Sequence, residues 1–210
     1  MAKNKTSRQW VHDHINDPYV KQAQAQGYRS RAAFKLLQID ERDRLLGPGK
    51  VVVDLGSTPG GWSQVAAKKT LPGGRVIALD LLPMEPVTGV HFIQGDFRED
   101  DTLGQLVTAL DGRPVGLVLS DMAPNLTGIA LTDQARSIHL LELALEFSRE
   151  YLKSGGDMLV KVFQGTGFDA LRRDMEQLFD TVSVRKPDSS RDRSAEVYLL
   201  CRGRRGEPSA

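Results

Sequence analysis

The chain has 210 residues, of which 26% are charged and 40% hydrophobic, which is enough for one domain with a substantial core. No stretch of the sequence is apolar enough for a membrane helix, and the basic first residues lack the apolar segment of a secretory signal. A single cysteine, Cys201, excludes an internal disulfide framework. We therefore expect a cytoplasmic protein with no membrane partner, and a monomer by default.

The charges are unevenly distributed along the chain. Residues 1–50 carry a net charge of +5, residues 51–184 carry −7, and residues 185–210 carry +3. If the two basic ends fold to one side, they form a cationic face suited to nucleic-acid phosphates. A solvated surface with a basic tail explains the same distribution.

The first 49 residues predict a basic, helical N-terminal extension. A short helical turn is expected at residues 10–16, followed by a helix over 18–26 with Asp17 as its cap and Pro18 in the first helical position. A second helix is expected over 30–45. Arg31 and Lys35 lie four residues apart in it, so both cations project from one side of the helix.

A glycine-rich turn follows the first predicted strand, residues 51–55, in Val51-Val-Val-Asp-Leu-Gly-Ser-Thr-Pro-Gly-Gly-Trp62. Thr58 is a good helix cap, Pro59 suits the first helical position, and the glycines at 60 and 61 would let a ligand approach the backbone. The spacing fits neither the G-x-G-x-x-G dinucleotide fingerprint nor a phosphate-binding P-loop. An acid before the turn, Asp54, and no lysine within it suit a cationic ligand such as S-adenosylmethionine. A tight turn that binds no ligand remains the alternative.

Further strands are expected at residues 75–80, 90–94, 115–121 and 157–163, with helices at 59–69, 103–110, 132–153 and 168–179. Two closing strands are expected at 182–184 and 195–201. Strands that alternate with helices predict an α/β fold: a doubly wound, mostly parallel sheet with helices on both faces and an antiparallel last strand. We expect one domain over residues 1–203 and a disordered tail over 204–210.

Acidic residues follow several predicted strands, at the edge where doubly wound sheets bind ligands. Asp80 lies twenty residues beyond Gly60, where a strand-end acid commonly accepts ribose hydroxyls. Asp96 is placed to accept from an adenine amino group. The four histidines show no metal-ligand spacing, so we expect no metal and a structural role for each.

Lys161 interrupts an apolar strand in which a charge is unexpected. Glu196 begins the last strand, and Asp121 ends another at the same sheet edge. These three side chains could converge on a bound ligand, with Lys35 arriving from the N-terminal helix. A pair of structural salt bridges explains the same residues.

The sequence resembles the FtsJ family of ribosomal RNA ribose 2′-O-methyltransferases over nearly its whole length. The resemblance rests on Tyr28-Arg-Ser-Arg-Ala-Ala-Phe-Lys-Leu36, the glycine turn, Ser120-Asp-Met-Ala-Pro-Asn125, Val160-Lys-Val-Phe163 and Ser194-Ala-Glu-Val-Tyr198. It implies a Rossmann-like S-adenosylmethionine-dependent methyltransferase fold. It also implies a catalytic tetrad and a set of methyl-donor contacts. The implied tetrad is Lys35, Asp121, Lys161 and Glu196; the implied donor contacts are Gly60, Trp62, Asp80, Asp96 and Asp121.

The implied reaction is methyl transfer from S-adenosylmethionine to the ribose 2′-hydroxyl of a uridine in 23S rRNA, within the large ribosomal subunit. S-adenosylhomocysteine is the product and no metal takes part. Lys161 would accept or orient the hydroxyl proton, Glu196 would position Lys161, and Lys35 would steer the substrate oxygen.

Three alternatives stay open. The substrate could be another RNA, such as a tRNA or an mRNA cap. The chain could also be a non-catalytic RNA-binding factor in ribosome assembly. The indole of Trp62 could serve only for packing, since large aromatic side chains near helix starts usually bury apolar area.

Overall fold

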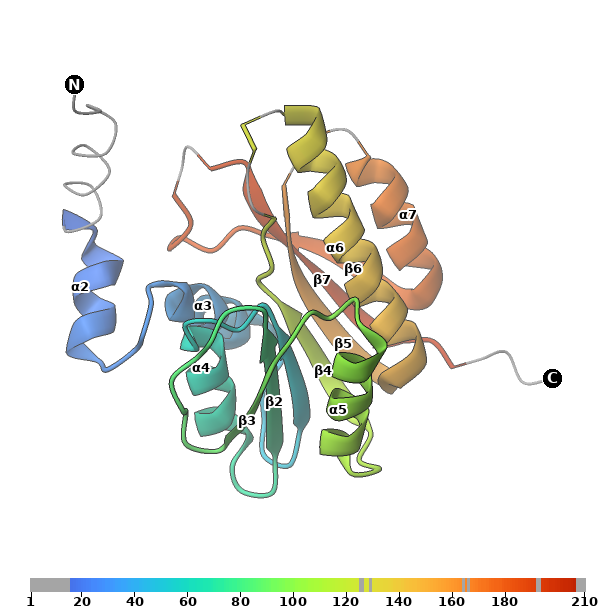
Figure 1. Cartoon of the computed structure of the whole chain (residues 1–210). Coiled ribbons are helices and arrows are strands. Elements are labelled where there is room, and N and C mark those ends of the chain that lie inside the picture. The colour runs from blue at the N-terminus through green and yellow to red at the C-terminus, as the bar shows by residue number, and fades with distance from the viewer. Residues whose placement is uncertain are drawn as a thin grey trace.

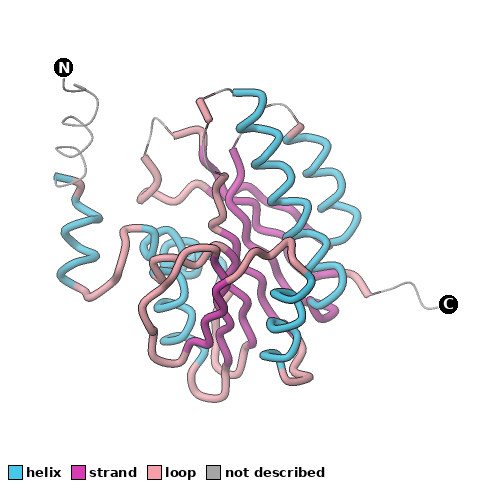
Figure 2. Tube along the Cα trace, in the orientation of Figure 1, coloured by secondary structure: helices cyan, strands magenta, loops and turns pink. Residues whose placement is uncertain are grey.

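A computed structural model describes residues 16–124, 127–128, 130–163, 165, 167–191 and 194–206. Its centre is a seven-stranded sheet with the order β3-β2-β1-β4-β5-β7-β6, flanked by helices (Figures 1 and 2). The strands are β1 Val51–Leu55, β2 Arg75–Asp80, β3 Val90–Gln94, β4 Val115–Ser120, β5 Leu152–Phe163, β6 Phe179–Arg185 and β7 Glu196–Arg204. The helices are α2 Pro18–Ala25, α3 Ala32–Asp43, α4 Gly61–Thr70, α5 Asp100–Leu110, α6 Ala130–Tyr151 and α7 Phe168–Leu178.

The direction of the strands agrees with the predicted fold class. Strands β1 to β5 pair in parallel, whereas β7 lies antiparallel between β5 and β6. The carboxyl ends of β1, β2, β3, β4 and β5 therefore meet at one edge of the sheet, and β7 begins at that edge. This arrangement brings the start of the last strand to the edge where acids lie at the end of β2 and just after β3 and β4.

Two hydrophobic cores cover the two faces of the sheet, with α3 and α4 on one face and α5, α6 and α7 on the other (Figure 1). Successive strand residues enter alternate cores, as the period of two requires. In β5, Val160 and Val162 pack in the core of the second face, whereas Leu159 packs in the α3–α4 core. Lys161, between the two valines, is thereby directed to the face that α3 covers.

Several sequence predictions are confirmed. Strands β1, β2 and β3 have the predicted bounds. Helix α2 begins at Pro18, and Asp17 caps it by accepting from the backbone N–H of Tyr19 at 2.9 Å. The helical turn predicted at residues 10–16 lies outside the described residues except for Asn16. No helix within the described ranges is long and apolar enough to cross a membrane.

The predicted start of the helix after the glycine turn, with Thr58 as its cap and Pro59 as its first residue, is wrong. Helix α4 begins at Gly61 and its cap is Gly60, whose φ of 106° favours glycine. Thr58 cannot serve as the cap because its groups bond elsewhere: its N–H donates to Asp80 at 2.9 Å and its hydroxyl to the carbonyl of Leu82 at 3.1 Å. Local propensity favours Thr58 as a cap, but its hydrogen bonds go to residues of another segment instead.

The boundary between α6 and β5 also differs from the prediction. The helix ends at Tyr151 rather than at residue 153, and the strand begins at Leu152 and runs through Gly155 and Gly156. The pairing with β4 shifts register in this part, and Gly155 has a φ of 73°. The two glycines therefore form an irregular start of a strand instead of ending a helix.

The remaining boundaries move by a few residues. Helix α5 begins at Asp100, three residues early, where two acids favour a helix N-terminus. Helix α7 ends one residue early because Phe179 opens β6. Strand β7 continues to Arg204, the first residue of the predicted tail, and residues 207–210 lie outside the described part of the chain.

A buried carboxylate joins α3, which carries Lys35, to α4. Asp40 is 5% exposed, accepts from the N–H of Leu46 at 2.7 Å and pairs with Lys69 at 2.5 Å. We expect Asp40→Ala to lower the free energy of unfolding by about 2 kcal/mol, because the Leu46 N–H loses its acceptor. Urea denaturation measures this change.

The matched control is Glu146→Ala on the exposed side of α6. Glu146 pairs with Arg149 at 3.3 Å, but both side chains are more than half exposed. We expect a change within about 0.5 kcal/mol. An equal loss in the two variants would contradict a specific role of Asp40.

Candidate active site

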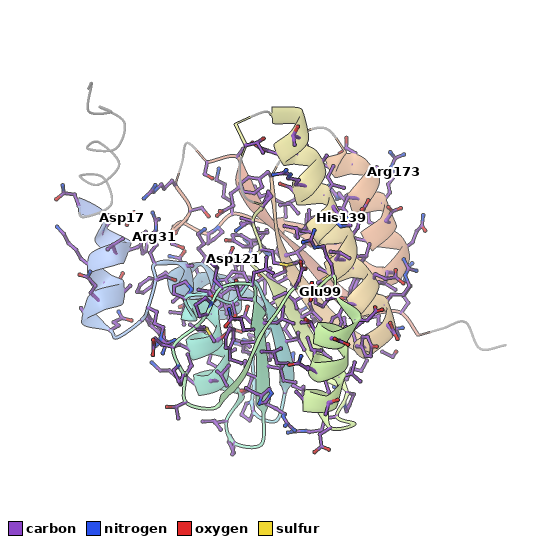
Figure 3. The ribbon with its side chains drawn as sticks, in the orientation of Figure 1. Asp17, Arg31, Glu99, Asp121, His139 and Arg173 are labelled. Carbon is purple, nitrogen blue, oxygen red and sulfur yellow. The ribbon has the colours of Figure 1, made fainter. Side chains whose placement is uncertain are left out.

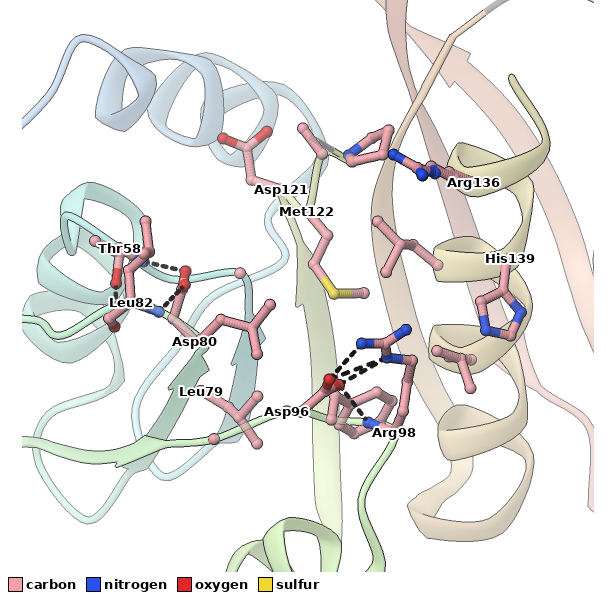
Figure 4. A pocket seen from close by; sticks show the side chains of 18 residues that line it. Thr58, Leu79, Asp80, Leu82, Asp96, Arg98, Asp121, Met122, Arg136 and His139 are labelled. Carbon is pink, nitrogen blue, oxygen red and sulfur yellow. Dashed lines mark hydrogen bonds and ion pairs between the residues drawn. The ribbon is translucent and has the colours of Figure 1, made fainter. Parts of the chain in front are cut away.

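A cavity of about 550 Å³ opens at the carboxyl edge of the parallel strands (Figure 4). Its floor comes from the ends of β2, β3 and β4, and α6 forms one wall. Three of the predicted site residues, Asp80, Asp96 and Asp121, line it. The volume lies within the range of small-molecule sites. The three acids outnumber the two arginines of the lining, Arg98 and Arg136, which favours a ligand with cationic character.

Asp80 shapes the loops around this cavity. One carboxylate oxygen accepts from the N–H of Thr58 in the glycine turn, and the other accepts from the N–H of Leu82, each at 2.9 Å. A carboxylate offers about four lone-pair sites, so acceptor capacity remains for ligand hydroxyls. Its position agrees with the predicted ribose contact.

Asp96 is paired with an arginine that the sequence reasoning missed. Arg98 contacts both carboxylate oxygens, and Figure 4 shows the pair inside the cavity. Hydrogen bonds from the Arg98 side chain and backbone lower the pKa of Asp96 to about 2. Asp96 is therefore ionised at neutral pH and able to accept a hydrogen bond from a ligand amino group.

The glycine turn uses its glycines chiefly for contacts within the protein. A Cβ on Gly60 would lie 2.9 Å from Met84 Sδ, and one on Gly61 would lie 2.6 Å from Ser30 Oγ. Gly60 does not line the cavity of 550 Å³. We predicted that a ligand would approach the backbone at Gly60. The close approach of other segments of the chain also explains this glycine.

Trp62 is a packing residue in this structure. It is 2% exposed, its Nε1 donates to the carbonyl of Ala32 at 2.7 Å, and its ring lies 5.6 Å from that of Tyr198. It also borders a small cavity of about 30 Å³ that touches Asp121. The burial of the indole agrees with the alternative that Trp62 serves for packing. A contact between Trp62 and a ligand would then be made through its backbone.

Lys161 is held next to Asp121. The residue is 9% exposed, its Nζ donates to the backbone carbonyl of Asp121 at 2.6 Å, and it lies 3.1 Å from Asp121 Oδ1. The register explains the contact, because Val160 pairs with Ser120 and Asp121 follows directly. Asp121 lies near the middle of the molecule, at the cavity (Figure 3).

Lys35 and Glu196 form the second ion pair, although they are 161 residues apart in sequence and Glu196 was expected to position Lys161. Lys35 Nζ donates to Glu196 Oε1 at 2.5 Å, and both side chains are largely buried. Burial opposes ionisation of Glu196, but the charges of Lys35 and Lys161 outweigh it and lower the pKa of this carboxyl. Glu196 is therefore a carboxylate at neutral pH.

Tyr198 joins the two pairs and is the main residue that sequence reasoning missed. Its hydroxyl lies 3.1 Å from Asp121 Oδ1 and 3.3 Å from Glu196 Oε1, and its residue pairs directly with Lys161 across β5 and β7. Burial and the two nearby carboxylates raise its pKa well above 10, so it stays a donor. A usable signal was present, since Tyr198 lies two residues after Glu196 and shares its strand face.

The four predicted catalytic residues, Lys35, Glu196, Asp121 and Lys161, therefore converge in one contact network, and Tyr198 links its two ion pairs. The wall on α6 adds His139, which was assigned a structural role and is found lining the cavity. His12 and His14 lie outside the described residues. Within the described ranges, no group of three or more histidine, cysteine or acidic side chains could hold a metal ion.

Asp54 is a buried acid beneath the glycine turn. It is fully buried, Oδ2 accepts from Ser63 Oγ at 2.5 Å, and Oδ1 has no hydrogen-bond partner among the described residues. Burial raises the pKa of this carboxyl to about 7; the Ser63 hydrogen bond opposes the rise, and the charges of Asp121 and Asp80 add to it. Near neutral pH, Asp54 therefore changes charge in the folded protein.

These residues fit S-adenosylmethionine. The cavity has three carboxylates for a ligand with an ammonium and a sulfonium, and the acids at the ends of β2 and β3 lie where a nucleoside binds in such sheets. Ser57 Oγ, in the glycine turn, borders the smaller cavity and has no partner among the described residues. A buried hydroxyl without a partner is available to a ligand.

Most of the chain is similar to known methyltransferases. The family model "FtsJ-like methyltransferase" matches residues 28–204. Proteins named ribosomal RNA large subunit methyltransferase E are 63% identical in Azoarcus sp. strain BH72 and 61% identical in Dechloromonas aromatica; the matches cover 95% and 96% of this chain and 98% of each relative. A crystal structure from Plasmodium falciparum, described as a ribosomal RNA methyltransferase, has a TM-score of 0.75 and 30% identity, covering 86% of this chain and all of that one.

Asp54 predicts a pH dependence of stability. Below about pH 4 its carboxyl is protonated in both the folded and the unfolded chain. Between about pH 4 and 7 the unfolded chain ionises while the folded chain keeps the proton, so the free energy of unfolding falls, by on the order of 3–4 kcal/mol in total. Above pH 7 both forms are ionised and the effect levels off.

We therefore expect Asp54→Asn, which still accepts from Ser63, to gain stability over the wild type by about 2 kcal/mol between pH 5 and 7.5. Urea denaturation across this range measures the difference. Asp111→Asn is the control, because the Asp111 side chain is 82% exposed. A difference that is constant with pH would contradict the raised pKa.

Proposed function

Because this chain belongs to the FtsJ-like methyltransferase family, we propose that it transfers a methyl group from S-adenosylmethionine to a ribose 2′-hydroxyl of ribosomal RNA. The acceptor is a uridine of 23S rRNA in the large ribosomal subunit. The observation that carries the proposal is the convergence of the four residues of the predicted tetrad, two lysines and two acids, beside a cavity that three acids line. A binding module would have no need of a lysine buried inside a strand.

The donor side is formed by the acids that line the cavity. Asp80 is assigned to the ribose hydroxyls and Asp96 to the adenine amino group, in line with their positions at the end of β2 and just after β3. Asp121, between the cavity and Lys161, faces the cationic end of the donor. S-adenosylmethionine supplies an activated methyl group when bound, so these residues mainly hold and align it.

The acceptor side is formed by the two lysines. Lys161 Nζ is oriented by the backbone carbonyl and the carboxylate of Asp121, and it is assigned the role of accepting or orienting the 2′-hydroxyl proton. Lys35 is fixed by Glu196 and directs the substrate oxygen. The Tyr198 hydroxyl has one proton to donate and lies within hydrogen-bonding distance of both carboxylates, so it links the two ion pairs.

The identity of the RNA is supported by the relatives. The proteins from Azoarcus and Dechloromonas are named as methyltransferases of large-subunit ribosomal RNA, and this chain matches them over almost their full length. The basic N-terminal extension, over residues 1–49, and the basic C-terminal segment agree with an RNA substrate. We further propose that the protein acts as a monomer in the cytoplasm and uses no metal.

The test supplies purified protein with methyl-labelled donor and one of three substrates: naked 23S rRNA, 50S particles or tRNA. We expect label in a uridine ribose of 23S rRNA, located by mass spectrometry of nuclease fragments. Label in tRNA would replace the proposed substrate with another RNA. Binding to ribosomal particles with no transfer to any RNA would favour a non-catalytic assembly factor.

Replacing Lys161 tests the proposed proton transfer. We expect Lys161→Ala to lower kcat by at least about 100-fold, because general acid–base groups typically contribute 10²–10⁴. Donor affinity, measured by calorimetry with S-adenosylhomocysteine, should change less than about threefold. Lys153→Ala is the control, since Lys153 is an exposed lysine near the other end of the same strand. Turnover of Lys161→Ala near the wild-type rate would refute the role.

A further inference from the structure

The loop between β2 and β3, residues 81–89, forms part of the mouth of the donor cavity. Leu81 and Leu82 line the cavity and are 58% and 62% exposed. Within the loop, Met84 is the one buried residue, at 9% exposure. A loop with so little buried apolar surface depends on a few specific contacts for its position.

Arg29 makes several of these contacts from the N-terminal extension. Its guanidinium donates to the carbonyl of Glu85 at 2.5 Å and to that of Pro86 at 2.7 Å, both in the loop. It also donates to the carbonyl of Pro59 in the glycine turn at 3.2 Å. One side chain thus bridges the two segments that flank Asp80 along the edge of the cavity.

At the junction of Arg29, the glycine turn and the 81–89 loop, the loop also packs against Gly60. A Cβ on Gly60 would lie 2.9 Å from Met84 Sδ and 3.2 Å from both the Arg29 guanidinium and Val87. The glycine turn, the loop and Arg29 therefore pack together with no space for a further side chain. Gln64 anchors this junction to α4, accepting from the N–H of Arg29 at 2.9 Å and donating to the carbonyl of Gly27 at 3.0 Å.

We propose that Arg29 is a positioning residue for the methyl donor. The Arg29 side chain holds the 81–89 loop against the glycine turn and so fixes the mouth of the donor cavity. The inference rests on the proposed function, because it assumes that the cavity binds S-adenosylmethionine. Arg29 stands three residues before α3, which carries Lys35. The N-terminal extension therefore shapes the donor cavity as well as supplying a residue to the acceptor side.

The chemistry of the contacts distinguishes this role from one in folding. All three acceptors described for the guanidinium are backbone carbonyl oxygens, and all three hydrogen bonds are exposed. Water can replace an exposed donor, so removing the side chain leaves the core intact and frees the loop. Only arginine presents several donors in a rigid planar fork, which suits carbonyls on separate segments better than a lysine does.

The test is donor binding in the absence of RNA. For the full-length protein, calorimetry measures the affinity for S-adenosylhomocysteine in the wild type and in Arg29→Ala and Arg29→Lys. We expect Arg29→Ala to weaken binding about tenfold and Arg29→Lys to recover part of the loss. In turnover assays, KM for S-adenosylmethionine should rise by a similar factor while kcat at saturating donor stays within about threefold.

Arg113→Ala is the matched control. Arg113 also donates to a loop carbonyl, that of Gly73 at 2.6 Å, but it follows α5 and does not line the donor cavity. We expect its donor affinity to equal that of the wild type. Affinity of Arg29→Ala within twofold of the wild type, or an equal loss in Arg113→Ala, would overturn the inference. Failure of the wild type itself to bind S-adenosylhomocysteine would instead overturn the proposed function.

Discussion

The structure depends on one constraint: a lysine buried in the central sheet must have hydrogen-bond acceptors for its ammonium group. Burying an isolated ammonium is costly, so Lys161 requires acceptors at a fixed place. The carbonyl and carboxylate of Asp121 supply them, and they do so because β4 ends one residue before Asp121, in register with β5. The parallel pairing of two neighbouring strands therefore sets the geometry of the proposed catalytic group.

The second ion pair follows from the one antiparallel strand of the central sheet. Since β7 runs against β5, its first residue, Glu196, reaches the edge at which the parallel strands end. The pleat then directs Glu196 and Tyr198 to the face that α3 covers, where Lys35 meets the carboxylate. Two lysines and two acids surround one tyrosine hydroxyl. Such a network of mutual contacts keeps both lysine side chains oriented.

The donor side is built differently, from loops instead of strands. Asp80 bonds the N–H groups of Thr58 and Leu82, and Asp96 is held by Arg98, so each acid is oriented before a ligand arrives. The glycine turn is compact because its glycines let Met84, Ser30 and Met122 approach the backbone closely. Preorganised acceptors of this kind suit a reaction in which the enzyme chiefly aligns two reactants.

Periodicity and turn chemistry in the sequence determined the fold class, the bounds of β1 to β3, the cap at Asp17 and the acids at the sheet edge, because these depend on near neighbours along the chain. The tetrad came from a buried charge at Lys161 together with family resemblance. Only the tertiary structure decided the cap of α4, the start of β5, the pairing of Asp96 with Arg98, the packing of Trp62 and the central place of Tyr198. Each of these features depends on a hydrogen bond or a packing contact from a segment that is distant in the sequence. Residues that are neighbours along the chain do not determine which distant segment makes that contact.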